Sequence, residues 1–537
     1  MLKTFTSLIL LCFVSTSFAQ MPVLVKDINT GPGGFSDIGN SAVAKCTNGN
    51  ELYFNANDSV HGRELWVTDG TNAATHLVKD INPGDASSDA FPLGVMNGKM
   101  LFGAWDDGMH YHLWSTDGTA AGTVQVHDVS PLPIRMTLFN GKMYFAGRDS
   151  TYPTTNLWVT DGTTAGTHIV KELNQQADAN PANLIEYNGR LYFQAYAPQS
   201  DVKIWSTDGT DTGTRILDNV AGNLTIQTYY PHFAVYKNRL WFAASDYTHG
   251  TEVWSSDGTD TGTHMLKDIA YGSSNCFAHG MTVYHNLLCF AGYGGLYSTD
   301  GTDTGTHMFS TVALWPGALE PFSFTAYNDK LYFDGADSLG GELWVTDATD
   351  TGTYMIKDIF PTPPSYPSPM SSAPYRMKVF NGLLYFEAND TTRIQIWTTD
   401  GTTNGTQKLW PSFADSNGWV SGDFEICNNM LFFDADYENA IGAELYRIGG
   451  PTAISPVQLA NETVTVFPNP TKDIFTVRFS QSAKATIKLL NMSGVLLKNE
   501  TVNGLTKDID LTGFPPGIYL LDITNDSGHM MKRVAKL

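Results

Sequence analysis

The phrase ELWVTDGTNAATHLVKDI, at residues 64–81, decides the fold because near-copies of it recur along the chain. The other copies are LWSTDGTAAGTVQVHDV from Leu113, LWVTDGTTAGTHIVKEL from Leu157, IWSTDGTDTGTRIL from Ile204, VWSSDGTDTGTHMLKDI from Val253, LYSTDGTDTGTHMF from Leu296, LWVTDATDTGTYMIKDI from Leu343 and IWTTDGTTNGTQKLW from Ile396. Their aspartates fall 43 to 53 residues apart. A period of this length is typical of propellers and solenoids.

Each repeat resolves into four short strands. In the third copy we predict strands at 136–139, 142–146, 156–160 and 168–173, with Asn140-Gly141 as a tight turn after the first. Asn-Gly suits a two-residue hairpin turn, because both central residues need positive φ. The turn recurs at Asn48-Gly49, Asn97-Gly98, Asn188-Gly189 and Asn381-Gly382, with Asn238 and Asn328 as variants. Four antiparallel strands per repeat, with no helix to cover them, predict the blades of an all-β propeller.

The two ends of the repeat array are complementary. Residues 21–28 form a fourth strand with no partners before it, and residues 422–448 supply three strands with no fourth. We expect the N-terminal strand to complete the last blade, which closes the ring and removes two exposed edges. Counting this hybrid blade gives nine; eight is the alternative if one unit is irregular. An open solenoid would leave both incomplete ends unexplained.

The repeated phrase resembles the ELWxxDGT repeat proteins of secreted bacterial origin, over about residues 21–450. The resemblance implies a secreted repeat scaffold, and it brings no established activity.

A second domain follows the repeats. After a linker at 450–460, residues 461–537 read as about seven short alternating strands, which favours a small Ig-like β-sandwich. This stretch resembles the type A C-terminal sorting domain of the type IX secretion system of Bacteroidetes. The resemblance rests on Pro468-Asn469-Pro470, Ser493-Gly494, Gly517-Ile518-Tyr519-Leu520, Lys532-Arg533 and Lys536. It implies recognition by an outer-membrane translocon and sorting machinery, then release or surface anchoring. An Ig-like module with a ligand of its own is the alternative.

The N-terminus and the charge agree with export. Residues 1–19 are predicted to be a signal peptide, with Lys3 before an apolar run and Ser17-Phe18-Ala19 at the cleavage site. We therefore expect residues 20–449 to form the mature propeller. No later stretch is apolar and long enough to be a transmembrane segment. The formal charge of −22 disfavours nucleic acid as a partner. We expect a protein secreted or anchored at the outer-membrane cell surface.

The Asp-Gly-Thr motif admits two interpretations. A second acid three residues on suggests a calcium site in four copies, those of Asp208, Asp257, Asp300 and Asp347. A turn explains all copies: the Asp side chain accepts a backbone N–H two residues on, and Gly takes positive φ. We favour the turn and no cofactor, with calcium as the alternative. The repeated tryptophans of the phrase are expected to pack between blades.

The cysteines beyond the signal peptide are Cys46, Cys276, Cys289 and Cys427. We interpret them as buried small hydrophobic residues. A bridge between Cys276 and Cys289 is disfavoured, because a hairpin turning at His285-Asn286 places Cys289 opposite Thr282.

Function is expected in the connections between second and third strands and between blades, which differ in every repeat and emerge on one face. Candidate ligand-binding aromatics there, for a glycan or a surface protein, are Trp105, Tyr111, Tyr152, Tyr196 and Tyr247. Ordinary loop packing is the alternative. An Asp followed by Ser or Thr and an aliphatic residue or Thr resembles a Bacteroidetes O-glycosylation acceptor, which predicts glycosylation at Ser59, Ser150, Ser338 and Thr391.

No catalytic constellation stands out in the sequence. The leading hypothesis is a non-catalytic binding or adhesion scaffold exported by the type IX system. A hydrolase or lyase acting on extracellular polysaccharide is the first alternative, because paired carboxylates cannot be located among 54 acids. A structural component of the envelope or matrix is the second.

Overall fold

The computed structural model describes residues 21–30, 36, 45–106, 110–198, 201–219, 221–226, 233–314, 324–338, 340–362, 369–391, 393–409, 420–436, 443–450, 464–467, 471–490, 496–515, 517–525 and 528–536. Every regular secondary-structure element in these residues is a β-strand, which confirms the all-β prediction. The chain divides into two compact units, Met1–Leu409 with Asn417–Tyr446, and Trp410–Ser416 with Arg447–Leu537. The predicted signal peptide and nearly all of the predicted linker lie outside the described residues.

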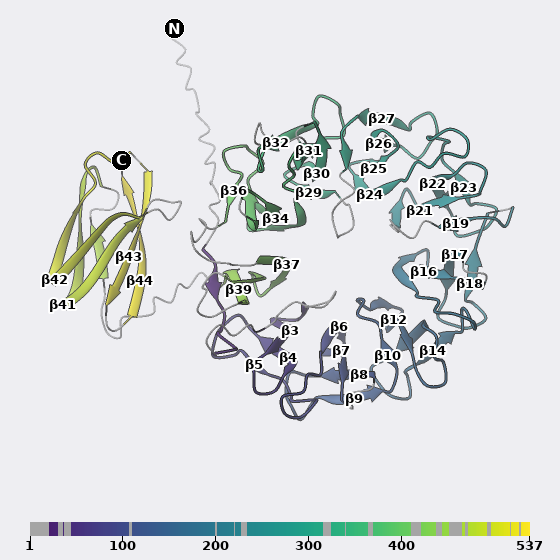
Figure 1. Cartoon of the computed structure of the whole chain (residues 1–537), viewed down its shortest axis with the longest axis horizontal. Coiled ribbons are helices and arrows are strands. Elements are labelled where there is room, and N and C mark those ends of the chain that lie inside the picture. The colour runs from purple at the N-terminus through teal and green to yellow at the C-terminus, as the bar shows by residue number, and fades with distance from the viewer. Residues whose placement is uncertain are drawn as a thin grey trace, which may run out of the picture. The chain divides into compact units, whose positions relative to one another are not determined.

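Within its described residues, the first unit contains nine antiparallel sheets that follow one another around a ring (Figure 1). The first sheet has β2 (Lys45–Asn48), β3 (Glu51–Asn57), β4 (Arg63–Thr68) and β5 (His76–Leu77); the second has β6 (Phe91–Met96), β7 (Lys99–Trp105), β8 (Tyr111–Thr116) and β9 (Val124–His127). The third has β10 (Ser130–Pro131), β11 (Thr137–Phe139), β12 (Lys142–Arg148), β13 (Asn156–Thr160) and β14 (His168–Lys171); the fourth has β15 (Ala182–Tyr187), β16 (Arg190–Tyr196), β17 (Val202–Thr207) and β18 (Arg215–Leu217).

The remaining sheets repeat the pattern. The fifth has β19 (Thr225–Ile226), β20 (Ala234–Tyr236), β21 (Arg239–Ser245), β22 (Thr251–Ser256) and β23 (His264–Met265); the sixth has β24 (His279–Tyr284), β25 (Leu287–Gly292), β26 (Gly295–Thr299) and β27 (His307–Ser310). The seventh has β28 (Ala313–Leu314), β29 (Thr325–Tyr327), β30 (Lys330–Asp337), β31 (Gly340–Thr346) and β32 (Tyr354–Lys357); the eighth has β33 (Tyr375–Phe380), β34 (Leu383–Asn389), β35 (Ile394–Thr399) and β36 (Gln407–Lys408). The ninth joins β37 (Val420–Cys427), β38 (Met430–Ala435) and β39 (Glu444–Gly449) to β1 (Val23–Leu24).

The predicted hairpin turns are present, with one correction. Asn140 and Gly141 have φ of 48° and 72°, as a two-residue turn of this kind requires. In the first sheet, however, β2 runs through Asn48, which pairs with Glu51. The turn there is Gly49-Asn50, and the prediction of Asn48-Gly49 was one residue early because this repeat has one more residue before its second strand.

The hybrid ninth sheet confirms the predicted pairing of the two ends of the repeat array. β1 lies next to β39 in this sheet, and just after β1 the Val25 N–H donates to the Leu445 carbonyl of β39 at 2.9 Å. Val25 is 2% exposed, within a core cluster that also holds residues of the first sheet. The N-terminal segment is therefore both an edge strand of the last sheet and part of its contact with the first.

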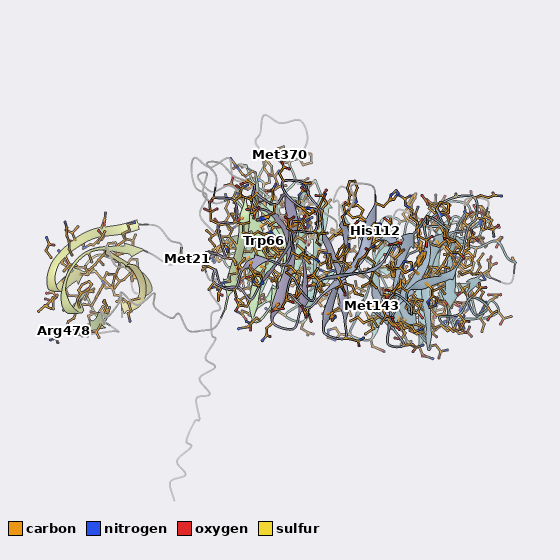
Figure 2. The ribbon with its side chains drawn as sticks, turned by 90° about the horizontal axis from the view of Figure 1, so that it is seen from below. Met21, Trp66, His112, Met143, Met370 and Arg478 are labelled. Carbon is orange, nitrogen blue, oxygen red and sulfur yellow. The ribbon has the colours of Figure 1, made fainter. Side chains whose placement is uncertain are left out.

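The core is divided into clusters that each lie between neighbouring sheets. Trp114 of the second sheet packs with Tyr53 and Cys46 of the first, and it stacks on Phe102 of its own sheet with ring centroids 6.3 Å apart. Trp66 packs in the same way against the ninth sheet. Figure 2 shows Trp66 among the side chains that fill the space between strands. The tryptophans of the phrase therefore pack between sheets, as predicted.

Cys46, Cys276, Cys289 and Cys427 are buried, as predicted, and each has a free thiol, a point that the sequence left open. Cys289 pairs in register with Thr282, the register that disfavoured a bridge to Cys276.

The second unit is a single sheet of five strands among its described residues, fewer than the predicted seven. They are β40 (Val464–Phe467), β41 (Ile474–Leu490), β42 (Leu496–Asp510), β43 (Gly517–Asn525) and β44 (Gly528–Lys536). The count differs because β41 and β42 are long strands that run through an irregularity between Arg478 and Ala483. Their buried side chains form one core cluster around Phe475, Ile487 and Leu521. The two-sheet sandwich stays a prediction.

Candidate functional site

The TDGT phrases form self-contained turns. In the fifth sheet, Asp257 Oδ1 accepts the Thr259 N–H at 2.9 Å and the Thr259 hydroxyl at 2.7 Å. Gly258 has φ of 96° and donates its N–H to Ser256 Oγ at 3.0 Å. The hydrogen bond from the Thr259 hydroxyl is the main cause that lowers the pKa of Asp257. The same bonds recur at Asp208, Asp300 and Asp347, which supports the turn interpretation.

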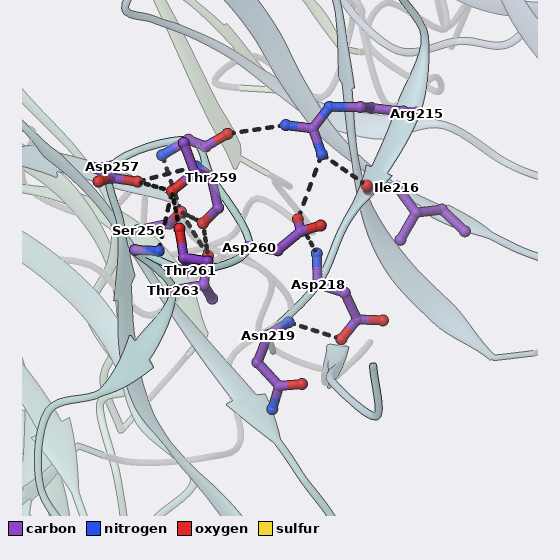
Figure 3. A network of polar contacts seen from close by, with 12 residues as sticks. Arg215, Ile216, Asp218, Asn219, Ser256, Asp257, Thr259, Asp260, Thr261 and Thr263 are labelled. Atoms are coloured by element: carbon purple, nitrogen blue, oxygen red, sulfur yellow. Dashed lines mark hydrogen bonds and ion pairs between the residues drawn. The ribbon is translucent and has the colours of Figure 1, made fainter. Parts of the chain in front are cut away.

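In three of these turns the second acid binds a cation of the preceding sheet. Arg215 of the fourth sheet lies 3.3 Å from Asp260 Oδ1 of the fifth, and the same oxygen accepts the Asp218 N–H at 3.2 Å (Figure 3). Lys171 pairs likewise with Asp211 at 2.8 Å. Among the described residues, His, Cys, Asp and Glu nowhere gather in a group of three or more able to hold a metal ion. These acids therefore join neighbouring sheets, and the calcium alternative gains no ligand cluster from them.

The predicted binding aromatics do not gather at one place. Trp105 and Tyr111 contact each other edge to face with centroids 5.0 Å apart, and Tyr152 packs on Trp158. Tyr196 is half-buried against the core between the fourth and fifth sheets. Tyr247 is different, because 64% of its surface is exposed. Four of the five predicted residues thus take part in packing.

Three further exposed aromatics lie on segments next to the loop of Tyr247, and sequence reasoning did not single them out. Tyr271, Phe277 and Tyr293 are 89%, 49% and 64% exposed. They lie in the connection from the fifth to the sixth sheet and in the turn between β25 and β26. We call Tyr247, Tyr271, Phe277 and Tyr293 the aromatic edge patch. The sequence did not reveal Tyr271, Phe277 and Tyr293, because they do not recur at one position of the repeat and only their exposure distinguishes them from core aromatics.

Backbone contacts hold the segments of the aromatic edge patch together. The Cys276 N–H donates to the Thr251 carbonyl at 2.7 Å, and the Thr251 N–H donates to Asn275 Oδ1 at 2.8 Å. On the other side, Cys276 Sγ lies so close to Gly292 that a Cβ there would be 2.8 Å away. The connection that carries Tyr271 and Phe277 is therefore fixed between the loop of Tyr247 and the turn of Tyr293.

Two members of the patch have strained backbones. Tyr247 has φ of 66° and Phe277 has φ of 52°, a region that bulky residues rarely occupy. Such strain costs of the order of 1–3 kcal/mol and persists where the surrounding structure imposes it, often at functional sites. The strain is held in place at Tyr247 by Asp246, whose Oδ1 accepts the Thr248 and His249 N–H groups at 2.9 Å. The same positive φ occurs at the equivalent positions of other repeats, at Ser59 (66°) and at Asp89 and Asn180 (45°), so this backbone conformation belongs to the repeat, and at these two positions it carries an aromatic ring.

Acids surround the aromatic edge patch. The Tyr247 hydroxyl donates to Asp201 Oδ2 at 3.3 Å, and Asp268 accepts the N–H of Gly272 beside Tyr271. Asp246 also holds His249 Nδ1 at 2.9 Å, and this hydrogen bond raises the pKa of His249. Segments 244–252, 268–279 and 291–295 contain neither lysine nor arginine.

A second polar cluster lies where the ninth sheet meets its two neighbours. Lys45 of β2 pairs with Asp434 of β38 at 2.6 Å, and both side chains are fully buried. Burial raises the pKa of Asp434 to about 6. Arg376 of β33 pairs with Glu387 at 3.2 Å. Because the buried pair joins the first sheet to the last, we assign this cluster to the assembly of the ring.

The sorting-signal residues that can be placed have structural roles. Tyr519 is 5% exposed, and its hydroxyl donates to the Pro515 carbonyl at 2.5 Å. Lys536 Nζ donates to the Leu511 and Phe514 carbonyls at 2.9 and 3.0 Å. Gly517 begins β43 and Lys532 is half-buried in β44. Pro468, Asn469, Pro470 and the Arg533 side chain lie outside the described residues.

The predicted glycosylation residues are all exposed, and they occupy the same place in their repeats. Ser59, Ser150, Ser338 and Thr391 each follow an aspartate in the connection between the second and third strands. Modification of these hydroxyls stays a prediction. We expect the intact mass of protein secreted by the native host to exceed the mass of the processed chain, and an unmodified mass would contradict this.

Comparison with known proteins identifies the second unit. Residues 465–536 match the family described as secretion system C-terminal sorting domain. The chain therefore carries a type IX secretion sorting domain, and it is exported and then secreted or attached to the cell surface. Among the described residues there is no helix of the length and hydropathy needed to cross a membrane.

Other similarities are partial. The chain is 25% identical over 130 residues to the ulvan lyase NLR42 of Nonlabens ulvanivorans, which covers 23% of this chain and 24% of the lyase. The chain thus spans about a quarter of that relative. PorZ, a surface component of the type IX secretion system of Porphyromonas gingivalis, aligns with 93% of this chain and 75% of its own at 12% identity and a TM-score of 0.32. A puromycin-hydrolysing peptidase of Mycobacterium tuberculosis aligns with 78% and 60% at 11% identity and a TM-score of 0.34. We take no functional conclusion from these two structures.

Proposed function

We propose that this chain is a secreted or surface-anchored binding protein without catalytic activity, in which a closed nine-bladed β-propeller displays the aromatic edge patch to a carbohydrate. The observation that carries the proposal is the patch itself: four exposed aromatic side chains on adjoining segments. Export to the cell exterior places such a surface where glycans are available.

Contacts at the junction of the ninth and first sheets support a closed ring. Lys26, just after β1, donates to the Thr75 carbonyl of the first sheet at 2.7 Å and lies 5.9 Å from the Trp66 ring centroid. The corresponding Lys79 of the first sheet donates to Thr123 of the second at 3.1 Å and lies 5.6 Å from the Trp114 ring. The junction between the two ends of the array is therefore built like an internal one.

Exposed aromatics on a rigid frame suit carbohydrate binding. Tyrosine offers a large flat apolar face with a polar tip, and it loses little conformational entropy on binding because it has few rotatable bonds. The patch needs little reorganisation, since backbone bonds and the Asp246 side chain already fix its segments. Large exposed apolar surfaces on soluble proteins commonly mark interaction sites.

The proposal is tested with the mature chain, residues 20–537, by affinity electrophoresis through gels that contain soluble polysaccharides. We expect retardation by at least one polysaccharide, and at least a tenfold loss of affinity when Tyr271 and Tyr293 are both changed to Ala. Tyr354→Ala is the matched control, because Tyr354 is 42% exposed on β32, outside the patch. Binding that survives the double substitution, or no binding to any polysaccharide, would show that the patch does not have this role.

An enzyme acting on polysaccharide is a second candidate. The identity with an ulvan lyase favours it, and so does the Asp246–His249 pair at the border of the patch, because a histidine held through Nδ1 by a carboxylate can serve as a general base. Asp58 holds His61 with the same geometry at 2.8 Å, in a repeat outside the patch. If the chain degrades a polysaccharide at this site, His249→Gln abolishes turnover and His61→Gln leaves it unchanged. Equal loss in both variants, or no turnover, would count against the enzyme.

A further inference from the structure

We infer that the aromatic edge patch selects uncharged glycan chains and excludes polyanionic ones. This inference rests on the proposed function and adds the chemical class of the ligand. It follows from the charges and the exposure of the residues that make and border the patch.

Charge is the first argument. Sulfate and carboxylate groups of a polysaccharide are bound in proteins by arginine and lysine, which offer charge-assisted hydrogen bonds. The three segments that form the patch contain neither residue, but they contain Asp246 and Asp268; Lys267, just before Asp268, pairs with Asp303 of the sixth sheet. Asp201 adds a third carboxylate, at hydrogen-bond distance from the Tyr247 hydroxyl. At physiological salt, charges within about 8 Å still interact, so a polyanion laid on the rings would be repelled.

The polar groups of the patch suit sugar hydroxyls. Ser273 and Ser274 are exposed between Tyr271 and Phe277, and their hydroxyls can both donate and accept. Carboxylates beside the rings accept hydrogen bonds from hydroxyl groups. The patch therefore offers partners for a neutral sugar, whose hydroxyls are donors and acceptors without net charge.

Exposure argues against a small organic cation as the ligand. Acids and aromatic rings together can also bind a quaternary ammonium group, but such sites enclose the cation in a cage of rings. Tyr271 is 89% exposed and Tyr293 is 64% exposed, so in the part of the chain that the structure describes they are open platforms with no opposing wall. Open rings fit an extended chain that lies across the surface.

The test compares polysaccharides that share a backbone and differ in charge: hydroxyethylcellulose with carboxymethylcellulose, and dextran with dextran sulfate. The mature chain, residues 20–537, is run through gels that contain each. We expect binding to a neutral member, at least tenfold weaker binding to its anionic counterpart at 50 mM salt, and a smaller difference at 500 mM salt, where charges are screened. Tyr271→Ala with Tyr293→Ala removes the binding, and Tyr354→Ala does not.

A gain-of-function variant sharpens the test. Ser273→Lys places a cation on the exposed connection beside Tyr271, and we expect it to raise affinity for the anionic member several-fold with little change for the neutral one. If the unmodified chain binds the anionic member as tightly as the neutral one through Tyr271 and Tyr293, the inference fails and the proposed binding function stands. Stronger patch-dependent binding to cationic glycol chitosan also overturns it. If no probe binds through the patch, the proposed function itself fails.

Discussion

At the scale of single residues, one TDGT phrase has alanine in place of glycine, and a smaller residue in the preceding sheet compensates for the added methyl group. At Gly209 and Gly258 an added Cβ would lie 2.4 and 2.5 Å from a tyrosine hydroxyl of the preceding sheet. In the seventh sheet this glycine is replaced by Ala348, which keeps φ of 67° and is buried. The preceding sheet has Cys289 where a tyrosine stands in other repeats, and both residues belong to one core cluster. The small cysteine makes room for the alanine methyl.

This pairing predicts a strongly non-additive double mutant. Cys289→Tyr alone should lower the free energy of unfolding by about 1–3 kcal/mol, because it overpacks the space beside Ala348. Cys289→Tyr with Ala348→Gly restores the combination found between other sheets and should recover most of that loss. Denaturant unfolding followed by tryptophan fluorescence measures it, since all 12 tryptophans precede residue 450. Additive effects of the two substitutions would refute the compensation.

A buried glutamate is the second residue-scale feature, and sequence analysis did not single it out. Glu444 is fully buried, and its carboxylate accepts the Ile28 and Asn29 N–H groups at 3.3 and 3.5 Å and the Ser36 hydroxyl. Glu64 holds the connection after its own sheet in the same way, through the Ile81 N–H at 3.2 Å. Burial raises the pKa of Glu444 and of Glu64 to about 7, although these hydrogen bonds act to lower it.

The raised pKa values predict that the first unit loses stability between about pH 4 and pH 7. The pKa of a glutamate in an unfolded chain is near 4.3. Between that pH and about 7, each of these glutamates therefore binds a proton in the folded state that it does not bind in the unfolded state. Its contribution is complete below about pH 4 and is lost as the pH rises through about 7. Glu444→Gln removes one such group, and its unfolding midpoint should fall less steeply with pH than that of the unmodified protein. Glu186→Gln, at an exposed strand position, is the control and should keep the original slope; identical slopes for all three proteins would contradict the assignment.

At the scale of elements, β1 has contacts out of proportion to its length. It is a strand of two residues, yet the segment around it supplies Val25 to the core, Lys26 to the first sheet and two N–H groups to Glu444. Without it, β39 would expose its outer edge and Glu444 would lose the donors that satisfy its carboxylate. The contacts of the segment, more than its strand hydrogen bonds, connect the ninth sheet to the first.

This predicts that the N-terminal segment acts as a separable part of the fold. A variant that begins at residue 37 should unfold at a lower denaturant concentration and show a greater tendency to associate through the β39 edge. A synthetic peptide of residues 21–36, added at excess, should bind it and restore much of the lost stability, because ligands of the folded state stabilise it by mass action. A peptide of the same composition in scrambled order should have no effect. Full stability without residues 21–36 would remove β1 from this role.

Element prediction succeeded where one residue type has one dominant local consequence. Asn140-Gly141 and the repeated Asp-Gly-Thr turn depend on positive φ and on hydrogen bonds within a few residues, so the sequence contains their cause. The hybrid sheet was predictable because β1 has no partner strand near it in sequence and the unit of β37, β38 and β39 has no fourth strand after it. The aromatic edge patch was not, because exposure of Tyr271 and Tyr293 depends on how three connections pack. The five strands of the second unit were miscounted for a related reason: β41 continues through an irregularity between Arg478 and Ala483, which the sequence pattern does not distinguish from the end of a strand.

At the scale of the whole molecule, the two units divide their tasks. The repeats carry the surface that we propose binds a ligand, and residues 465–536 match a sorting domain. Tyr519 is buried and Lys536 binds backbone carbonyls, so these sorting-signal residues maintain the domain's fold. Lys532, half-buried on β44, remains available at the surface for a sorting partner. Fold and recognition within the sorting domain can therefore be separated by substitution.

The final prediction concerns export. A variant lacking residues 460–537, made in a host with a type IX system, should keep its first unit folded and stay inside the outer membrane, because it lacks the part that the machinery recognises. Tyr519→Asp buries a charge in the domain core and should block export by unfolding the domain. Lys532→Ala should reduce export while the purified domain unfolds at an unchanged temperature, which separates recognition from stability. Protein in the medium or on the cell surface is measured by fractionation and surface proteolysis, with a host lacking the translocon as the reference. Export of the truncated chain at the normal level would show that the sorting domain is dispensable.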